Sequence, residues 1–341
     1  MRYIGGKSLI LENIESAIHQ NTKNVSSVLD IFSGSGAVSQ YLKTQGYKVY
    51  SNDFLYFSYI LNSCIELNEE PRFENLKIND PISYLNNLNI DDTDFKDSQL
   101  FIYNNYSPND KCDRMYFQEK NAKKIDIIRL TIEKWKNERK INDKEYKYLL
   151  CSLLNAVPYV ANITGVYAAY LKFWDKRTYN DLTLKPIEIN NNNNINICFN
   201  KDYHEILEEI EADLMYADPP YNSREYLPNY HILETIAKYD YPLVYGKTGV
   251  RNYDKQKSEF CKKATVKQAF INLISNCKCK YILISYNNEG LLSTEELSDI
   301  CKEFAVKDTF KLIEFNYRRY KSKIVNTKDG LKEQLYFLQR W

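Results

Sequence analysis

The 341-residue sequence is poor in histidine, glycine and proline, and it carries almost no net charge. With only three histidines, a histidine-based metal site is not expected. No run of about 18 apolar residues occurs, so no membrane-spanning helix is predicted. A formal net charge of +1 excludes a simple basic coat protein for nucleic acid. Because hydrophobic residues make up 44% of the chain, it can bury a core, and global disorder is not expected.

The eight cysteines are scattered, and the two nearest in sequence form a Cys-x-Cys pair at Cys277 and Cys279. No second pair lies at the spacing of zinc ligands. The N-terminal segment has no signal-peptide pattern, because Glu12, Asn13 and Glu15 interrupt its apolar residues. The sequence therefore indicates a cytoplasmic protein with reduced thiols and no bound metal.

Charge is segregated along the chain, although the total nearly cancels. Residues 66–113 carry an excess of acidic side chains, whereas 114–185 and 247–280 are rich in lysine and arginine. Basic blocks in an otherwise neutral protein indicate a surface for a polyanion. Ordinary solvated helix faces are the alternative explanation for each block.

The order of apolar segments predicts an α/β fold. Short apolar runs at 27–31 and 47–52 alternate with amphipathic segments at 10–18, 37–44 and 54–67. Strands that alternate with helices favour a doubly wound, mainly parallel sheet.

The alternation is lost in the middle of the chain. Between about residues 68 and 190, the segments 125–138 and 143–156 have helical patterns, and strand-like runs return only beyond this stretch. The sequence thus predicts a sheet domain formed by residues 1–67 and 191–341. A mostly helical domain, residues 68–190, is inserted into it.

A glycine-rich turn follows the first predicted strand. The residues from Asp30 to Gly36 read Asp-x-Phe-x-Gly-x-Gly, and Asp53 ends the next predicted strand. Glycines let the backbone approach a ligand, and a carboxylate after the second strand is where nucleotide-binding folds hold ribose hydroxyls. The third glycine of a dinucleotide motif is missing, so an adenosine ligand without a diphosphate fits better, such as S-adenosyl-L-methionine. A tight strand–helix connection without a ligand is the alternative.

The tetrapeptide Asp218-Pro219-Pro220-Tyr221 follows the predicted strand 213–217 directly. Two prolines fix the backbone at the carboxyl end of a central strand, where open α/β sheets bind ligands. The exocyclic amine of adenine is a poor nucleophile, because its lone pair is delocalised into the ring. We expect the Asp218 carboxylate and the Pro219 carbonyl to accept hydrogen bonds from this amine, and Tyr221 to stack on the base. A simple strand terminator is the alternative.

Together, the two motifs resemble those of the Dam-like adenine-N6 DNA methyltransferases of restriction–modification systems, in which the cofactor motif precedes the catalytic one. The resemblance implies a Rossmann-like, S-adenosylmethionine-dependent methyltransferase sheet with catalytic residues Asp218, Pro219 and Tyr221. It also implies contacts to S-adenosyl-L-methionine from the N-terminal motif, the glycine turn and the strand ends, namely Tyr3, Gly5, Gly6, Lys7, Asp30, Phe32, Ser33, Gly34, Gly36, Asp53 and Asp202.

In such enzymes the stretch between the ribose-binding acid and the catalytic tetrapeptide recognises the target, so the resemblance assigns this role to residues 68–190. Amide, aromatic and basic side chains can read base edges, stack on bases or bind phosphates. Those that we expect at the DNA are Asn162, Thr164, Tyr167, Lys172, Lys176, Arg177, Arg224 and Arg318. An ordinary helical subdomain with a tyrosine-rich core is the alternative. We expect His231 to pack against its surroundings rather than to act as a base.

The leading interpretation is a site-specific, monomeric DNA methyltransferase that modifies a flipped adenine in double-stranded DNA, with a restriction endonuclease as its biological counterpart. An RNA adenine-N6 methyltransferase and a non-catalytic nucleic-acid-binding protein of the same fold are the alternatives. The large insertion favours DNA, because a duplex site must be read before a base is flipped. A protein-glutamine methyltransferase would be expected to carry Asn at position 218. The missing third glycine argues against a dinucleotide oxidoreductase.

Overall fold

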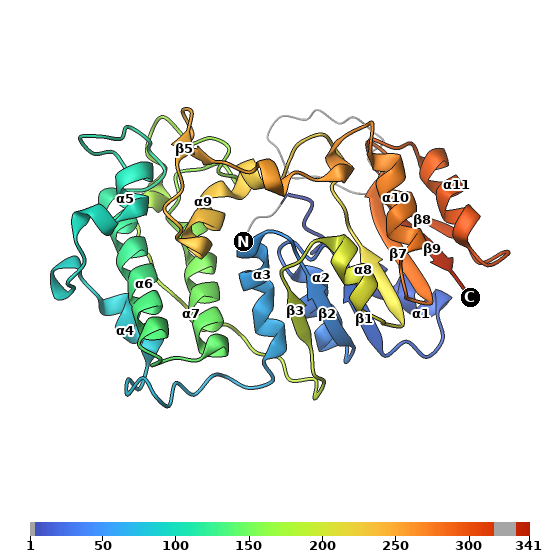
Figure 1. Cartoon of the computed structure of the whole chain (residues 1–341), viewed down its shortest axis with the longest axis horizontal. Coiled ribbons are helices and arrows are strands. Elements are labelled where there is room, and N and C mark those ends of the chain that lie inside the picture. Colours follow the sequence, from blue (N-terminus) through green and yellow to red (C-terminus); the bar gives the residue numbers. More distant parts are fainter. Residues whose placement is uncertain (1–3, 317–331) are drawn as a thin grey trace. The chain divides into compact units, whose positions relative to one another are not determined.

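The chain forms two compact units, each assembled from separated segments (Figure 1). The computed structural model describes residues 4–316 and 332–341. A sheet unit consists of Lys7–Phe54, Asn194–Glu225 and Gln256–Trp341, and a helical unit consists of Met1–Gly6, Leu55–Asn193 and Tyr226–Lys255. The predicted insertion, 68–190, falls inside the helical unit. That unit, however, begins earlier in the chain and also takes in a segment that follows the Asp-Pro-Pro-Tyr tetrapeptide.

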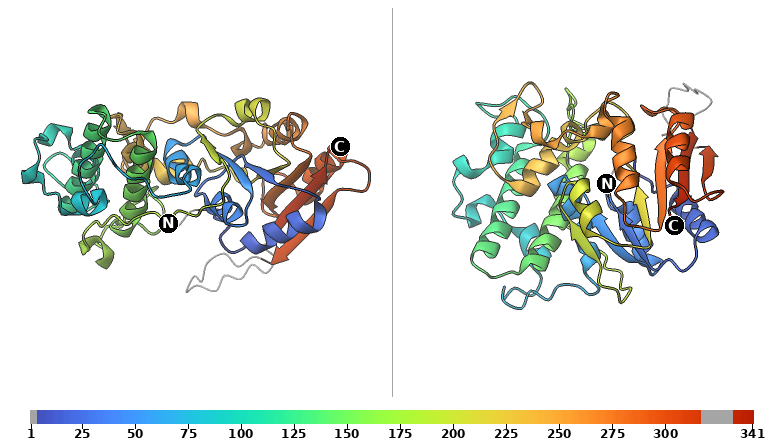
Figure 2. Two further views of the ribbon diagram at one scale, coloured as in Figure 1. Left: turned by 90° about the horizontal axis from the view of Figure 1, so that it is seen from below. Right: turned by 45° about the vertical axis from the view of Figure 1, so that its right-hand side comes forward.

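Within the described residues, the sheet unit contains a seven-stranded sheet in the order β3-β2-β1-β4-β7-β9-β8. The strands are β1 (Ser27–Asp30), β2 (Lys48–Asn52), β3 (Ile197–Phe199), β4 (Leu214–Ala217), β7 (Tyr281–Asn287), β8 (Lys311–Asn316) and β9 (Lys332–Gln339). The first five in this order are parallel neighbours, whereas β9 runs antiparallel to both β7 and β8. The strands β8 and β9 are drawn in red in Figure 2. The predicted α/β class with a mainly parallel sheet is confirmed.

Helices cover both faces of this sheet. They are α1 (Leu11–Asn21), α2 (Ala37–Thr44), α8 (Tyr203–Glu209), α10 (Val266–Ser275) and α11 (Thr294–Phe304). Successive strand residues point to opposite faces. Leu29, Met215 and Ile282 lie in an apolar cluster with residues of α8, α10 and α11. Asp30 points to the opposite face, because its side chain accepts a hydrogen bond from Ser39 of α2. The apolar alternation of the strands thus separates an apolar face from a face that carries polar groups.

The strand order reverses between β1 and β4. From β1 the chain adds β2 and β3 on one side, whereas β4 leads to β7 on the other. Asp30 is in register with Tyr216, and the backbone amide of Ile31 donates to the carbonyl oxygen of Tyr216 at 3.2 Å. Ligands of open α/β sheets bind beyond the carboxyl ends of the strands at such a reversal. The glycine turn after β1 and the tetrapeptide after β4 both begin there.

The helical unit contains α3 (Tyr56–Asn62), α4 (Pro81–Asn87), α5 (Phe101–Tyr106), α6 (Glu119–Asn137), α7 (Asp143–Ala156) and α9 (Leu227–Lys238), with a small hairpin of β5 (Val244–Tyr245) and β6 (Val250–Arg251). Short 3-10 helices lie at η1 (Ser63–Glu66), η2 (Ile90–Asp92), η3 (Asp97–Gln99), η4 (Val157–Tyr159), η5 (Lys176–Tyr179), η6 (Asp254–Gln256) and η7 (Glu259–Cys261). Of these, η7 belongs to the sheet unit, and η6 ends on its first residue, Gln256. The helix α7 begins with a capping box, in which Asn142 and Glu145 satisfy each other's backbone amides.

Buried charges at helix ends hold the helical unit together. Glu234 of α9 accepts hydrogen bonds from the backbone amides of Tyr56 and Phe57, at 3.3 and 2.8 Å, at the start of α3. Asp126 of α6 accepts from two amides in the first turn of α5, at 2.9 and 2.8 Å. Arg129 donates to two carbonyl oxygens in the last turn of α9, at 2.9 and 3.1 Å. These charges match the helix dipoles, and they tie α9 to α3 and α6 although it lies far from them in sequence.

All eight cysteines are buried and carry free thiols. Within residues 4–316 and 332–341, no cluster of three or more histidine, cysteine, aspartate or glutamate side chains is arranged to hold a metal ion. In the same residues, no helix has the length and apolar character that a membrane crossing requires.

Candidate active site

The glycine turn between β1 and α2 is a tightly bonded loop. Gly34 and Gly36 have φ angles of 50° and 81°, a left-handed conformation that residues with a Cβ rarely adopt. The amide and the hydroxyl of Ser33 both donate to the carbonyl oxygen of Asn52, at 2.9 and 3.0 Å. The amide of Gly34 donates to Asp53 Oδ2 at 2.8 Å. The turn after β1 is thereby fixed to the end of β2.

Asn52 joins the ends of three strands. Its side chain is 1% exposed, and Nδ2 donates to the carbonyl oxygens of Ile31 and Lys201, both at 3.2 Å. Its Oδ1 accepts from the amide of Lys201 at 3.1 Å. Asn52 therefore sets the spacing between the glycine turn, Asp53 and the loop after β3. Asn52 was not predicted as a site residue, because its role depends on contacts that sequence does not reveal.

Asp30 ends β1 as a buried carboxylate that is only partly satisfied. Its Oδ2 accepts a hydrogen bond from Ser39 Oγ at 2.6 Å. Its Oδ1 is buried and has no hydrogen-bond partner within the described part of the chain. Burial raises the pKa of Asp30 to about 7, and the nearby carboxylates of Asp218 and Asp53 add to this rise. Because an unsatisfied buried oxygen is costly, a ligand that donates to Oδ1 would bind favourably.

Asp218, directly after β4, takes part in a chain of charges. Lys7 Nζ lies 3.0 Å from Asp218 Oδ1 and 2.6 Å from Glu333 Oε1. Ser285 Oγ donates to the same Glu333 oxygen at 2.8 Å. The side chains of Lys7 and Glu333 are both 6% exposed, whereas that of Asp218 is 20% exposed. Asp218 is thus the group through which this buried network reaches the surface of the sheet unit.

Two groups of this network, Asp218 and Lys7, have shifted pKa values. Burial raises the pKa of Asp218 to about 6; the ammonium of Lys7 opposes this rise and the carboxylate of Glu333 adds to it. Burial alone would lower the pKa of Lys7, but the facing carboxylates of Asp218 and Glu333 raise it above its ordinary value. At neutral pH the lysine is therefore charged, and Asp218 is mainly ionised and able to accept a hydrogen bond.

The structure brings Lys7, Asp30, Gly34, Asp53 and Asp218 together within the sheet unit, at or near the strand-order reversal between β1 and β4. Ser33 and Gly36 lie in the same turn. Glu333 and Ser285 were not predicted from sequence. Ser285 lies on β7 and Glu333 on β9, and no local motif marks either residue.

Three further predicted residues have packing or capping contacts. The Phe32 ring lies against those of Tyr203 and Phe260, with centroids 5.5 and 5.3 Å away. Tyr221 is 6% exposed and belongs to the same apolar cluster as Phe260. Asp202 is the N-cap of α8, where its side chain accepts a backbone amide hydrogen bond. Their predicted roles at the cofactor and the base stay predictions.

The N-terminal motif is described only in part. Gly5 and Gly6 are half-buried, and Gly5 has a φ angle of 73°. Pro219 is buried. Tyr3 and Arg318 lie outside the described residues, so their predicted contacts stay predictions.

Of the residues predicted to contact DNA, Thr164, Lys172 and Lys176 are exposed on the helical unit, and Arg224 is exposed on the sheet unit. Arg177 is half-buried, and its guanidinium donates to the carbonyl oxygen of Ile163. The loop that carries the first three also exposes large aromatic rings: Tyr159, Phe173 and Tyr179 are 68%, 67% and 60% exposed. Exposed aromatic and basic groups on one loop suit a nucleic-acid contact.

Asn162 and Tyr167 instead lie inside the helical unit. Asn162 is 0% exposed; its Nδ2 donates to the carbonyl oxygens of Met115 and Leu171, both at 2.9 Å, and its Oδ1 accepts from the amide of Asp175 at 3.1 Å. Tyr167 is also buried. The amide of Asn162 is thus engaged in holding its loop rather than presented to a base edge, a difference from expectation that only the fold could reveal.

His231 is fully buried on α9. Its Nε2 donates to the carbonyl oxygen of Tyr167 at 3.0 Å, and burial lowers its pKa to about 4. It is therefore a neutral packing residue of the helical unit.

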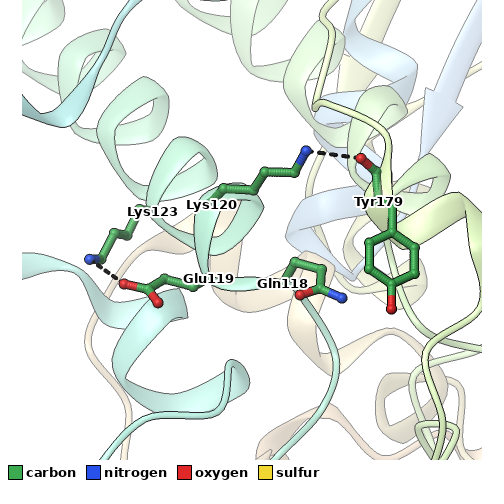
Figure 3. Close-up of a pocket in the computed structure, with 5 residues that line it drawn as sticks. All are labelled: Gln118, Glu119, Lys120, Lys123 and Tyr179. Atoms are coloured by element: carbon green, nitrogen blue, oxygen red, sulfur yellow. Dashed lines mark hydrogen bonds and ion pairs between the residues drawn. The ribbon is translucent and has the colours of Figure 1, made fainter.

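A surface hollow of about 500 Å³ lies at the start of α6 (Figure 3). It is lined by Gln118, Glu119, Lys120, Lys123 and Tyr179. Its lysines are engaged within the unit, since Lys120 bonds to the carbonyl oxygen of Tyr179 and Lys123 pairs with Glu119. The hollow belongs to the helical unit, whereas the glycine turn and Asp218 belong to the sheet unit. We do not assign it to the cofactor.

Comparison with known proteins decides the family. The profile of the family described as D12 class N6 adenine-specific DNA methyltransferase matches residues 3–300. The chain belongs to this family. The predicted resemblance to adenine-N6 DNA methyltransferases is thereby confirmed.

Several curated relatives of this D12-class chain are named as type II methyltransferases or modification methylases. It is 45% identical over 346 residues to "Type II methyltransferase M.FokI" of Planomicrobium okeanokoites, covering 100% of this chain and 53% of that protein. It is 41% identical over 345 residues to "Modification methylase StsI" of Streptococcus sanguinis, covering 100% and 52%. "Type II methyltransferase M.NlaIII" of Neisseria lactamica is 35% identical over 332 residues, covering 94% and 93%. The chain thus spans about half the length of the first two and nearly all of the third.

Proposed function

We propose that the chain transfers a methyl group from S-adenosyl-L-methionine to the N6 amine of a flipped adenine in a specific duplex DNA sequence. One observation carries the proposal: the glycine turn and the Asp218 elbow follow neighbouring strands, β1 and β4, at the reversal of the strand order. A cofactor loop and an amine-binding carboxylate placed in this way can serve one reaction.

The residues around the glycine turn fit the cofactor. The buried Oδ1 of Asp30, which has no hydrogen-bond partner among the described residues, is an acceptor for an ammonium group, the charged end of an amino-acid moiety. Gly34 leaves the backbone open to a close approach, and Asp53 places a carboxylate after β2 for ribose hydroxyls. When bound, S-adenosyl-L-methionine supplies an electrophilic methyl group on a sulfonium.

Asp218 acts on the target amine. Its carboxylate accepts a hydrogen bond from the adenine amine, which favours a pyramidal nitrogen with a localised lone pair. It then takes up the proton that the amine loses on becoming a methylamine. Because Asp218 keeps a partly exposed side chain and is mainly ionised at neutral pH, it can do both. The neighbouring Pro219 carbonyl is the second acceptor that we propose, and Tyr221 the stacking partner.

We propose that DNA is read by the helical unit. Its exposed loop presents Thr164, Lys172 and Lys176 with the rings of Phe173 and Tyr179. In the sheet unit, exposed lysines that can bind phosphates are Lys257, Lys262, Lys263 and Lys267. Since the relatives are named type II methyltransferases and modification methylases, the biological role proposed is protection of host DNA from a restriction endonuclease.

A labelling experiment tests this function. The purified chain is incubated with S-adenosyl-L-methionine labelled in its methyl group and with duplex DNA of diverse sequence, and the DNA is digested to nucleosides. The label is expected in N6-methyldeoxyadenosine, and it should be lost with Asp218→Asn. Label in methylated cytosine, or in RNA but not in DNA supplied at equal concentration, would contradict the proposal.

A further inference from the structure

A row of polar side chains crosses four adjacent strands on one face of the sheet. Asp30 on β1 is in register with Tyr216 on β4, and both point away from the apolar cluster that contains Leu29 and Met215. On β7 and β9, Ser285 and Glu333 likewise alternate with clustered residues and meet each other at 2.8 Å. Glu333 lies on β9, the last strand of the chain, yet its side chain belongs to the same row as Asp30, which precedes the glycine turn.

Lys7 connects this row to Asp218. Its ammonium contacts one oxygen of each carboxylate, 3.0 Å to Asp218 and 2.6 Å to Glu333. The shorter contact is to Glu333, whose oxygen also accepts from Ser285. Burying an ammonium on a long flexible side chain is costly unless charged partners hold it in place. Glu333 and Ser285 supply that anchorage from two neighbouring strands.

We propose that Glu333 is a positioning residue for methyl transfer: it anchors the Lys7 ammonium, thereby fixes the orientation of the Asp218 carboxylate, and limits how strongly Lys7 neutralises that carboxylate. The inference rests on the proposed function, in which Asp218 meets the target amine. Glu333 itself touches neither the amine nor the cofactor in this account.

The charges around Asp218 determine the sign of each expected effect. Among the residues that the structure describes, the groups that interact electrostatically with it are the ammonium of Lys7, the carboxyl groups of Glu333 and Asp30, and the phenol of Tyr216. Lys7 stabilises ionised Asp218, whereas Glu333 disfavours it. Removing the negative charge of Glu333 must therefore lower the pKa of Asp218, and removing the positive charge of Lys7 must raise it. If Glu333 and Lys7 only stabilised the fold, their replacement would not shift the pKa of Asp218 in opposite directions.

The test compares single-turnover rates of methyl transfer against pH for the full chain at saturating S-adenosyl-L-methionine and duplex DNA. The variants are Glu333→Gln, which keeps size and hydrogen bonding, and Lys7→Met, which removes the ammonium. Glu314→Gln is the matched control, because Glu314 is an exposed carboxylate on the adjacent strand β8 that pairs with Lys332. It makes the same chemical change in the same sheet, outside the Lys7 network.

The wild-type rate is expected to rise with pH through the ionisation of Asp218. In Glu333→Gln the midpoint should move to lower pH by roughly one unit, and in Lys7→Met it should move to higher pH by a similar amount. Glu333→Ala, which also loses the anchor, should lower the rate on the order of ten- to hundredfold. The dissociation constants for cofactor and DNA should stay within about threefold for the Glu333 variants, since Glu333 contacts neither ligand. Glu314→Gln should follow the wild-type curve.

An unshifted midpoint in Glu333→Gln, or shifts of the same sign in both variants, would overturn the inference. If Glu333→Gln does not fold, Ser285→Ala takes its place: it removes one donor to Glu333, and a wild-type rate there would also overturn the inference. Asp218→Asn separates the two proposals. If Asp218→Asn is active, Asp218 does not have its role in the proposed function. If Asp218→Asn is inactive but Glu333→Gln has the wild-type pH profile, only the role of Glu333 is refuted.

Discussion

Replacing Asp53 by alanine should weaken cofactor binding while leaving the chemical step intact. Asp53 follows β2, its Oδ2 accepts the amide of Gly34 at 2.8 Å, and its backbone carbonyl accepts from Asn200 at 2.8 Å. The side chain therefore joins the glycine turn to the proposed ribose site, whereas Asp218 lies after a different strand. Asp53→Ala therefore changes the proposed ribose site and leaves the surroundings of Asp218 as they are.

The size of the effect follows from the bonds that are lost. Hydrogen bonds to a charged group contribute about 1.5 to 3 kcal/mol each. Losing one such bond between the carboxylate and a ribose hydroxyl thus raises the dissociation constant of S-adenosyl-L-methionine about tenfold to 150-fold. Asp53→Asn keeps an acceptor for Gly34 but removes the charge, so its affinity should fall between those of the alanine variant and the wild type.

Isothermal titration of the purified variants with S-adenosyl-L-methionine measures the dissociation constants directly. Single-turnover methylation at saturating cofactor then checks that the rate stays within about threefold of wild type. Wild-type cofactor affinity in Asp53→Ala would refute the ribose assignment. A large loss of rate at saturation, with little change in affinity, would place Asp53 at the chemistry instead.

Four further outcomes are expected. Asp218→Asn should lower the single-turnover rate on the order of a thousandfold with nearly unchanged cofactor affinity in titration; wild-type turnover would remove this carboxylate from the mechanism. The wild-type rate should fall as the pH drops through about 6, because protonated Asp218 cannot accept the amine proton, and a flat rate between pH 5 and pH 8 would argue otherwise. If the exposed lysines neutralise about five phosphates, DNA affinity measured by fluorescence anisotropy should fall several hundredfold between about 50 and 200 mM salt; a change below about tenfold would argue against that surface. Asp126→Ala should lower the free energy of unfolding by about 2 to 4 kcal/mol in urea titration, because two amides of α5 lose their acceptor; a change below about 0.5 kcal/mol would mean that water replaces it.

The sheet unit was largely predictable because its signals are local. Three strand ends are visible in the sequence itself. They are marked by the glycine turn after one apolar run, a carboxylate after the next, and the two prolines after a third. Parallel strands present their carboxyl ends at one edge, so Asp30, Asp53 and Asp218 were expected to converge. The position of β9 between β7 and β8 depends on long-range pairing and gave no such signal.

The remainder depends on contacts between distant segments. Glu333 and Lys7 come from opposite ends of the chain, so their ion pair could not be predicted from spacing. The same holds for Glu234, which accepts the amides of Tyr56 and Phe57 and so links α9, beyond the predicted insertion, to the start of α3. Asn162 looked suitable for reading bases because an amide can pair with a base edge, but burial rather than residue type determines whether it is accessible.

The most direct test of the central claim is a map of modified bases in the genome of a host that expresses this chain, obtained by single-molecule sequencing. N6-methyladenine is expected within one short sequence word at nearly every occurrence, and none is expected at that word with Asp218→Asn. Methylation of another base, methylation that Asp218→Asn leaves intact, or unmodified DNA despite abundant folded protein would contradict the central claim.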